Sequence, residues 1–113
     1  MTISVPSAET PYALVGFARP KPERAAELRE LLLSFVAPTR LEDGALEYHF
    51  HEDTDDPGTF VFYEVWRSKA DLDRHLNLPH MKAFWDNRMD YLEQDLDIRL
   101  LTMHSPYPSP ITP

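Results

Sequence analysis

The sequence predicts a single α+β domain, a ferredoxin-like β-α-β-β-α-β sandwich in which helices cover one face of an antiparallel sheet. Three observations support this prediction. The chain has 113 residues, enough for one domain and too few for two. Apolar residues recur at strand spacing in four segments and at helical spacing in the two regions that fit between them in this order. Two of the strand segments are apolar on both sides.

The first half of the fold is predicted to be a strand followed by a helix. Residues 12–19 form the strand, in which Leu14 alternates with Ala13, Val15 and Phe17. Pro20 ends it, and Pro22 suits the first turn of a helix. An apolar stripe at helical spacing follows, made of Leu28, Leu31, Leu32, Phe35 and Val36. We expect Pro38 to end this helix.

A hairpin is predicted next. Residues 44–52 alternate, with Leu46, Tyr48 and Phe50 on one face and Glu47, His49 and His51 on the other. The acidic residues 53–58, which include Pro57 and Gly58, are typical of a turn. Residues 59–66 form the second strand, with Phe60, Phe62, Glu64 and Trp66 on one face and Val61, Tyr63 and Val65 on the other.

The second helical region begins after Ser68, a good N-cap residue. We expect a helix over residues 69–77 that turns Leu72 and Leu76 inward, with His75 beside them. Pro79 interrupts it, and a second helical piece runs over residues 80–93. Its apolar side consists of Met81, Phe84, Trp85, Met89 and Leu92. The last strand is predicted over residues 96–103, with Leu96, Ile98 and Leu100 on one face.

The domain organisation is one folded unit with two peripheral ends. Residues 12–104 form the domain, and residues 1–11 are expected to be a flexible arm. Residues 105–113 have proline at nearly every other position, which favours extended polyproline geometry and predicts a tail. Since two strands are apolar on the face that helices do not cover, we also predict a homodimer whose sheets pack together.

Composition excludes several classes of function. The net charge of −8 argues against a nucleic-acid partner. The chain has no cysteine, hence no thiolate chemistry, and its three glycines build neither a dinucleotide nor a phosphate loop. No apolar run approaches the ~20 residues that cross a membrane, and the first residues lack the features of a signal peptide. We therefore expect a cytoplasmic protein with no membrane partner, whose redox chemistry would need either a substrate that supplies its own electrons or a cofactor bound without glycine loops.

Several segments resemble the antibiotic biosynthesis monooxygenase family, which belongs to the dimeric α+β barrel superfamily. The similarity extends over residues 12–103, and its most specific parts are the F-x-F-Y-E-x-W segment at residues 60–66 and the H-x-x-x-P-H segment at residues 75–80. The resemblance implies oxygen insertion into an electron-rich phenol or quinol without metal or flavin, in a pocket between sheet and helices. A haem-degrading branch has an Asn on the first strand, a Trp on the third and a His in the late helix. Here Trp66 matches, whereas the first strand has no Asn and the late helix carries Trp85, which argues against haem degradation.

Glu64 and His75 are the candidate catalytic residues. Glu64 lies in the most apolar strand, where burial is expected to raise the pKa of its carboxyl, so it is a candidate base for a phenol proton. The alternative is an ion pair or hydrogen bond that stabilises the hairpin. His75 suits a proton shuttle near pH 7, and the alternative is a packed histidine bonded to Glu64 or to backbone.

The substrate pocket is predicted from the remaining aromatic and imidazole side chains, namely Tyr48, Trp66, His80, Phe84 and Trp85. Trp66 is suited to stacking on a planar substrate, or else closes the core. His80 has a helix-capping or structural role as its alternative, and Tyr48, Phe84 and Trp85 have the core as theirs, where aromatic residues at such spacing more often lie. His49 and His51 form an H-x-H pattern beside Glu47, which a polar sheet face explains better than a metal site.

Three functions follow from these residues. The leading hypothesis is a cofactor-independent monooxygenase that oxidises a quinol or polycyclic phenol with O₂. The first alternative is a dimer that binds a small aromatic ligand without converting it. The second is a non-oxidative isomerase that uses the same proton-transfer groups on the same fold.

Overall fold

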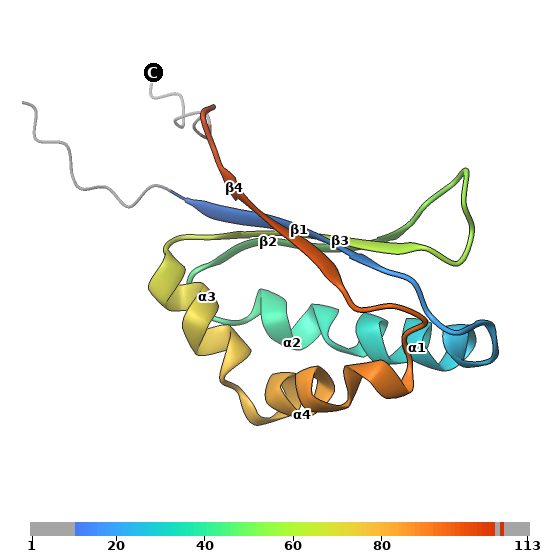
Figure 1. Cartoon of the computed structure of the whole chain (residues 1–113). Coiled ribbons are helices and arrows are strands. Elements are labelled where there is room, and N and C mark those ends of the chain that lie inside the picture. Colours follow the sequence, from blue (N-terminus) through green and yellow to red (C-terminus); the bar gives the residue numbers. More distant parts are fainter. Residues whose placement is uncertain (1–10, 106, 108–113) are drawn as a thin grey trace, which may run out of the picture.

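The computed structural model describes residues 11–105 and residue 107. Its strands form one antiparallel sheet in the order β2-β3-β1-β4, and the helices lie on one face of it (Figure 1). The strands are β1 (Tyr12–Ala18), β2 (Ala45–Glu52), β3 (Phe60–Trp66) and β4 (Asp97–Thr102). The α-helices are α1 (Ala25–Ser34), α2 (Val36–Arg40), α3 (Lys69–Leu76) and α4 (Pro79–Asn87), with 3₁₀ turns η1 (Pro22–Arg24) and η2 (Arg88–Asp90). The predicted ferredoxin-like fold class is confirmed.

The described residues do not include most of the two predicted ends. Residues 1–10 of the arm, and residues 106 and 108–113 of the tail, lie outside them. Within the described part of the chain, no helix is both long enough and apolar enough to cross a membrane.

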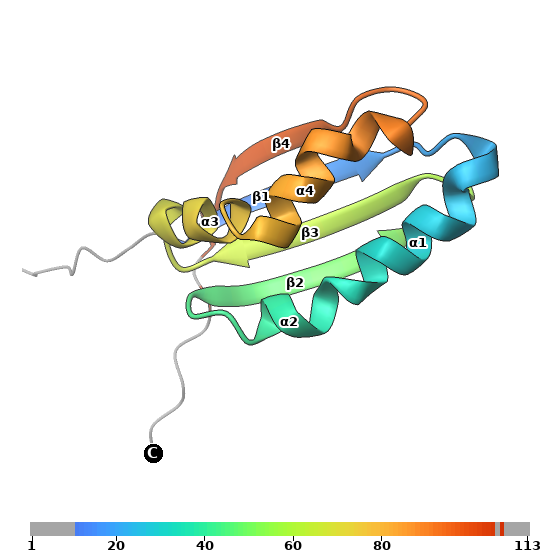
Figure 2. The same cartoon turned by 90° about the horizontal axis from the view of Figure 1, so that it is seen from below.

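Each strand turns one face towards the helix layer and the other face away from it. Seen from the helix side, α1 and α2 run along β2 and β3, while α3 and α4 lie towards β1 and β4 (Figure 2). On β1, Leu14 lies opposite Glu64 and Gly16 lies opposite Phe62. A Cβ atom on Gly16 would lie 2.3 Å from the Phe62 ring, so this ring packs directly against the glycine.

The first helical region differs from the prediction at Pro38. The break falls earlier, at Phe35, where α1 ends and α2 begins. Pro38 is the third residue of α2, and the first turn of a helix tolerates proline because its N–H groups have no intrahelical acceptor. The chain continues as a helix beyond it, since the Thr39 N–H donates to the Phe35 carbonyl at 3.1 Å.

The second helical region confirms Ser68 as the N-cap, because its hydroxyl accepts the Asp71 N–H. The inward positions differ from the prediction, because Leu76 is 44% exposed and His75 is fully buried with Leu72. The second piece starts at Pro79 and ends at Asn87, well before residue 93. Phe84 and Leu92 are buried, whereas Trp85, the next residue of α4, and Met89, in the 3₁₀ turn, are exposed.

A β-bulge corrects the predicted alternation of β2. The register against β3 shifts between Ala45 and Glu47, which inserts an extra residue and leaves Leu46 on the surface. Beyond the bulge the prediction is confirmed, because Tyr48 lies opposite Glu64 and Phe50 lies opposite Phe62.

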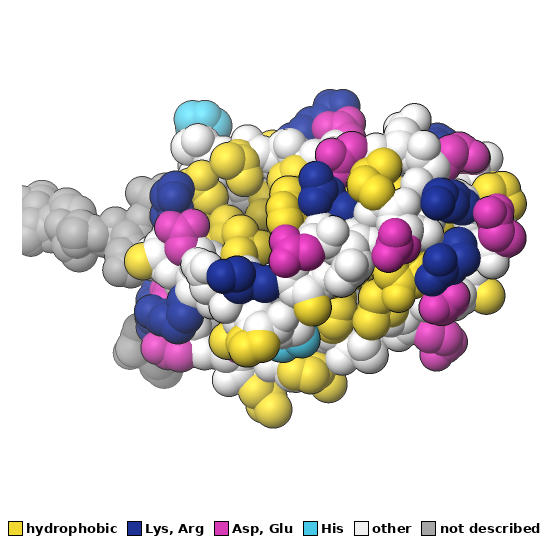
Figure 3. All heavy atoms as spheres, turned by 60° about the horizontal axis from the view of Figure 1, so that its bottom comes forward, with side chains coloured by type: hydrophobic (Ala, Val, Ile, Leu, Met, Phe, Trp, Pro, Cys, Tyr) yellow, Lys and Arg dark blue, Asp and Glu magenta, His cyan; other side chains and the backbone are white. Residues whose placement is uncertain are grey.

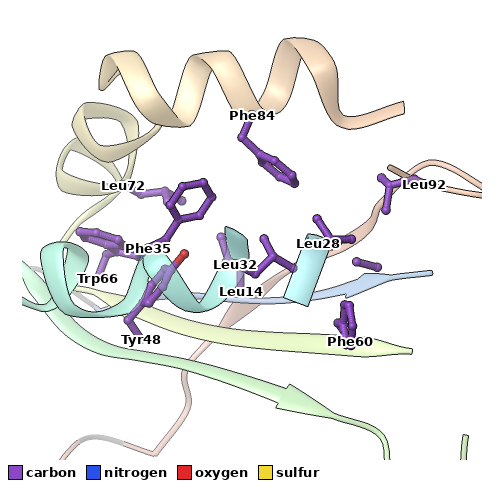
Figure 4. Close-up of a cluster of buried hydrophobic side chains, with 11 residues drawn as sticks. Leu14, Leu28, Leu32, Phe35, Tyr48, Phe60, Trp66, Leu72, Phe84 and Leu92 are labelled. Atoms are coloured by element: carbon purple, nitrogen blue, oxygen red, sulfur yellow. The ribbon is translucent and has the colours of Figure 1, made fainter. Parts of the chain in front are cut away.

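The core lies between the sheet and the helices (Figure 4). Its largest fully buried side chains include Trp66, Phe60 and Leu28. At one end of this layer Asp71, 2% exposed, accepts hydrogen bonds from Arg67, Ser68 and Arg74. The bond with Arg67 contributes most to lowering the pKa of the Asp71 carboxyl to about 2.

Gly44 lies next to Asp71 at this end of the fold, and we expect that a side chain cannot be accommodated there. Its φ is +90°, and a Cβ atom there would lie 2.4 Å from the Asp71 carboxyl carbon. Gly44→Ala should therefore lower the free energy of unfolding by about 3 kcal/mol through backbone strain and displacement of a buried charge. Gly58→Ala is the control, because φ is +97° but nothing lies within 4 Å, and it should cost about 1 kcal/mol. Equal losses in urea unfolding would contradict the proposed clash.

The sheet face opposite the helices is largely apolar in its centre. Val15, Phe17, Val61 and Tyr63 lie there and are partly exposed, and Leu101 is more exposed. Near its rim the Tyr107 hydroxyl donates to Glu47 at 2.5 Å. This face is the surface on which the sequence predicts a second copy.

Candidate functional site

A cavity of about 380 Å³ lies between the sheet and the helices, within the size range of small-ligand sites. Its wall is formed by Leu14, Leu32, Phe35, Tyr48, Phe50, Phe62, Glu64, Leu72, Leu76, Asn77, Met81, Lys82, Phe84, Trp85, Asp86, Leu96, Ile98 and Leu100. The most exposed apolar wall residues are Leu100 of β4, Trp85 of α4 and Leu76 of α3, so the cavity opens between β4 and these two helices. Hydrophobic side chains are visible on this side of the molecule, between charged ones (Figure 3).

Glu64 is the buried charged residue of the cavity wall. It is 5% exposed, whereas Asn77, Lys82 and Asp86 of the same wall are exposed. The alternation of β3 turns Glu64 towards the helices together with Phe62. A ligand deep in this cavity would therefore meet one buried carboxyl group among mainly apolar side chains.

The environment of Glu64 changes its acidity. Burial raises the pKa of its carboxyl to about 7, and the nearby Glu42 charge adds to this increase. The Trp66 indole N–H opposes it, since it donates to Oε1 at 2.9 Å and stabilises the ionised form. A carboxyl with a pKa near 7 can both accept and return a proton at neutral pH.

Tyr48 is the second polar group of the inner wall. It is 6% exposed, and its hydroxyl points from the sheet towards the helices (Figure 4). Burial, and then the charge of Glu64, raises the pKa of the phenol far above its usual value. Tyr48 is therefore neutral at physiological pH and able to donate a hydrogen bond.

The structure brings four of the sequence-predicted residues to the cavity. Glu64, Tyr48, Phe84 and Trp85 all line it. Their side chains come from two strands and from α4, so the topology unites positions far apart in the sequence.

The other three predicted residues do not line the cavity. Trp66 is fully buried and reaches it only through its hydrogen bond to Glu64. His75 is also fully buried, and its Nδ1 lies 2.9 Å from Glu42 Oε2 rather than beside Glu64. Burial lowers the pKa of His75, which favours a neutral imidazole that donates to Glu42. His80 is exposed and stacks on Phe35 with ring centroids 5.5 Å apart.

Some site residues were not predicted from the sequence. Glu42 follows α2 in a segment without a clear period, so nothing indicated its pairing with His75. Ile98 and Leu100 share one predicted strand face but were not predicted as wall residues, although that face was the signal that could have placed them there. Lys82 and Asp86 lie one helical turn apart on α4, but the pattern gave no reason to place them at a cavity.

The H-x-H pattern lies away from the cavity on the opposite face of the sheet. His49 pairs with Glu47 at 3.1 Å, and its other ring nitrogen lies 3.2 Å from the Arg40 guanidinium. His51 Nδ1 lies 3.3 Å from the Val61 carbonyl. Across residues 11–105 and 107, no group of three or more histidine or carboxylate side chains is arranged to hold a metal ion.

An antiparallel sheet with helices on one face, and a largely apolar cavity that contains one buried carboxyl group, define a small α+β protein with a ligand-sized site. The chain belongs to the antibiotic biosynthesis monooxygenase family, whose model matches residues 11–87. This result confirms the resemblance found in the sequence. The family supports a general monooxygenase function and specifies no substrate.

Solved structures share the fold at substantial identity. PA3566 of Pseudomonas aeruginosa is 33% identical with a TM-score of 0.78, over 85% of this chain and 96% of that one. Rv0793 of Mycobacterium tuberculosis is 30% identical with a TM-score of 0.81, over 87% of this chain and 99% of that one. The uncharacterized protein sll1783 of Synechocystis is 33% identical over 96 residues, which are 85% of this chain and 65% of that protein's length.

Proposed function

We propose that this chain is a cofactor-independent monooxygenase that oxidises a quinol or polycyclic phenol with O₂, with Glu64 as the general base. The observation that carries the proposal is a buried carboxyl, with a pKa raised to about 7, on the wall of an apolar cavity. Family membership supports the reaction class, and the resemblance in sequence supports the phenolic substrate and the absence of a cofactor.

The proposed reaction is balanced without another reductant. Glu64 accepts the phenol proton, and the electron-rich phenolate reacts with O₂. From a phenol, one oxygen atom becomes the second carbonyl of a quinone, and from a quinol it becomes the hydroxyl of a hydroxyquinone. In both cases the other oxygen atom leaves as water with the two hydrogens that the substrate loses. The substrate thereby supplies all four electrons that reduce O₂.

The surroundings of Glu64 fit the proposed role. Apolar walls keep water from a planar ring and from O₂, and Phe84 and Trp85 provide aromatic contact surface. Tyr48 lies opposite Glu64 in the β2-β3 register and, as a neutral phenol, can donate to a developing negative charge.

The direct test uses naphthols and hydroquinones as probes, with O₂ consumption and quinone formation measured together. The expected result is one quinone with one added oxygen atom per O₂, without H₂O₂, and with no product under anaerobic conditions. Glu64→Gln should lower kcat/KM by about 10²-fold or more while the probe still binds. Glu47→Gln, on the opposite sheet face, is the matched control and should retain the activity.

Other outcomes of this experiment would favour the alternatives. Thermal stabilisation by a probe, without product in air, would indicate a module that binds an aromatic ligand. Conversion of a probe at the same rate without O₂ would indicate an isomerase that uses Glu64 for proton transfer. Either result would contradict the monooxygenase proposal.

We further propose that the protein is a homodimer whose sheets pack through the apolar face of Val15, Phe17, Val61 and Tyr63. Phe17→Lys should convert the dimer into a monomer in sedimentation at micromolar concentration, because it places a charge in that contact. Leu33→Lys, at an exposed position of α1, should leave the dimer intact. A wild-type protein that sediments as a single subunit would contradict this assembly.

A further inference from the structure

The Trp66 side chain connects the cavity with the interior behind it. Its indole ring is fully buried outside the cavity wall, and its N–H donates to Glu64 Oε1 at 2.9 Å. No other hydrogen bond joins the Glu64 side chain to the described residues. One oxygen of the carboxyl group is therefore held from behind by the protein, and the other has no partner among these residues.

The indole ring is itself held in place by a buried imidazole. The ring centroids of Trp66 and His75 lie 4.7 Å apart, with planes inclined by 35°. His75 is fully buried, and its Nδ1 contacts both Glu42 oxygens, at 2.9 and 3.1 Å. Because Glu42 lies after α2 and His75 on α3, this pair joins the segment that follows α2 to α3.

We propose that Trp66 is a positioning residue, which fixes one oxygen of Glu64 through its indole N–H so that the other oxygen faces the ligand. Its role is distinct from stacking on a substrate, which its complete burial excludes. The indole N–H can only donate a hydrogen bond and cannot accept one, so it stabilises a carboxyl oxygen that has a free lone pair. This inference rests on the proposed function of Glu64, but its test requires no substrate.

The first experiment uses the two tryptophans of the wild-type chain and NMR of their indole N–H groups. The Trp66 signal should shift with pH at the same midpoint as the Glu64 carboxyl carbon. Trp85, whose indole N–H has no hydrogen bond to the described residues, serves as the internal control and should not follow that midpoint. In Glu64→Gln the titration of the Trp66 signal at that midpoint should disappear, and only a shift at lower pH, from His75 against the indole ring, should remain.

The second experiment removes the donor. Trp66→Phe should raise the titration midpoint of Glu64 by about one pH unit, because the ionised carboxyl loses its hydrogen bond. Phe60→Leu, a truncation of another fully buried residue on the same strand face, is the matched control and should leave the midpoint within about 0.3 units.

The outcomes separate the inference from the function. If the Trp66 N–H signal of the wild type does not shift at the midpoint of the Glu64 titration, the positioning role is overturned, whether or not the variants fold. An equal shift in Trp66→Phe and Phe60→Leu would also overturn it, because general loosening of the core would then explain the change. If both titrations behave as expected and no phenol is oxidised, the positioning role holds and the proposed function fails.

Discussion

The stability that Glu64 contributes should fall by about 3 kcal/mol as the pH rises from 4 to 8. The pKa of this carboxyl is about 7 in the folded chain and 4.5 in its unperturbed form. Between these values the folded state binds a proton that the unfolded state does not, so the contribution is complete below pH 4.5 and is lost as the pH rises through 7.

The measurement compares urea unfolding of the wild type and Glu64→Gln at several pH values in this window. Burial lowers the pKa of His75, which makes stability rise with pH, but this contribution is common to both proteins and cancels in their difference. Glu47→Gln is the control, because its hydrogen bond with Tyr107 lowers the pKa of Glu47 instead of raising it. A difference between wild type and Glu64→Gln that does not vary with pH would contradict the raised pKa.

Phe84→Ala should lower the free energy of unfolding by about 3 kcal/mol, whereas Trp85→Ala should cost less than about 1 kcal/mol. Both side chains line the cavity from adjacent positions of α4, but Phe84 is 8% exposed and Trp85 is 44% exposed. Phe84 meets Phe35 edge to face at 5.8 Å, and its removal leaves a void in the core. Trp85 lies under the Arg88 guanidinium at the surface, so solvent can replace its contacts.

The same two variants distinguish packing from binding. Trp85→Ala should weaken the binding of a naphthol probe at least as much as Phe84→Ala does, in spite of its small effect on stability. Calorimetric titration provides the affinities, and urea unfolding provides the stabilities. Comparable stability losses in the two variants would show that Trp85 is a core residue and that the cavity does not open beside it.

The strands could be predicted from the sequence because apolar residues recur at strand spacing. Residues 47–51 show this most clearly, since Tyr48 and Phe50 lie on the face that meets the helices and polar residues alternate with them. The helices were less predictable, because Pro38 is compatible with the first turn of a helix as well as with its end. The bulge in β2 has no signal in the pattern, and it alone displaced Leu46.

For the site, periodicity predicted on which face of its strand or helix each residue lies, but not how deeply its side chain is buried. Glu64, Tyr48 and Phe84 were identified because polar and aromatic side chains on the inner face of a sandwich have few other places to lie. His75 was assigned to proton transfer because of its residue type, whereas its position behind Trp66 depends on how α3 packs on β3. Glu42 could not be found at all, because its partner lies 33 positions away.

Gly16 has a consequence for the evolution of this site. The Phe62 ring, which lines the cavity, lies against the hydrogen atoms of the Gly16 α-carbon. No other residue would let the ring lie so close to the sheet, so glycine gives the cavity its greatest depth here. Exchange of one of these hydrogens for a methyl group would lift the ring into the space where a ligand is expected to lie. The volume of the cavity therefore depends on Gly16, although this residue is not part of the cavity wall. A related protein with alanine at this position would accept smaller substrates.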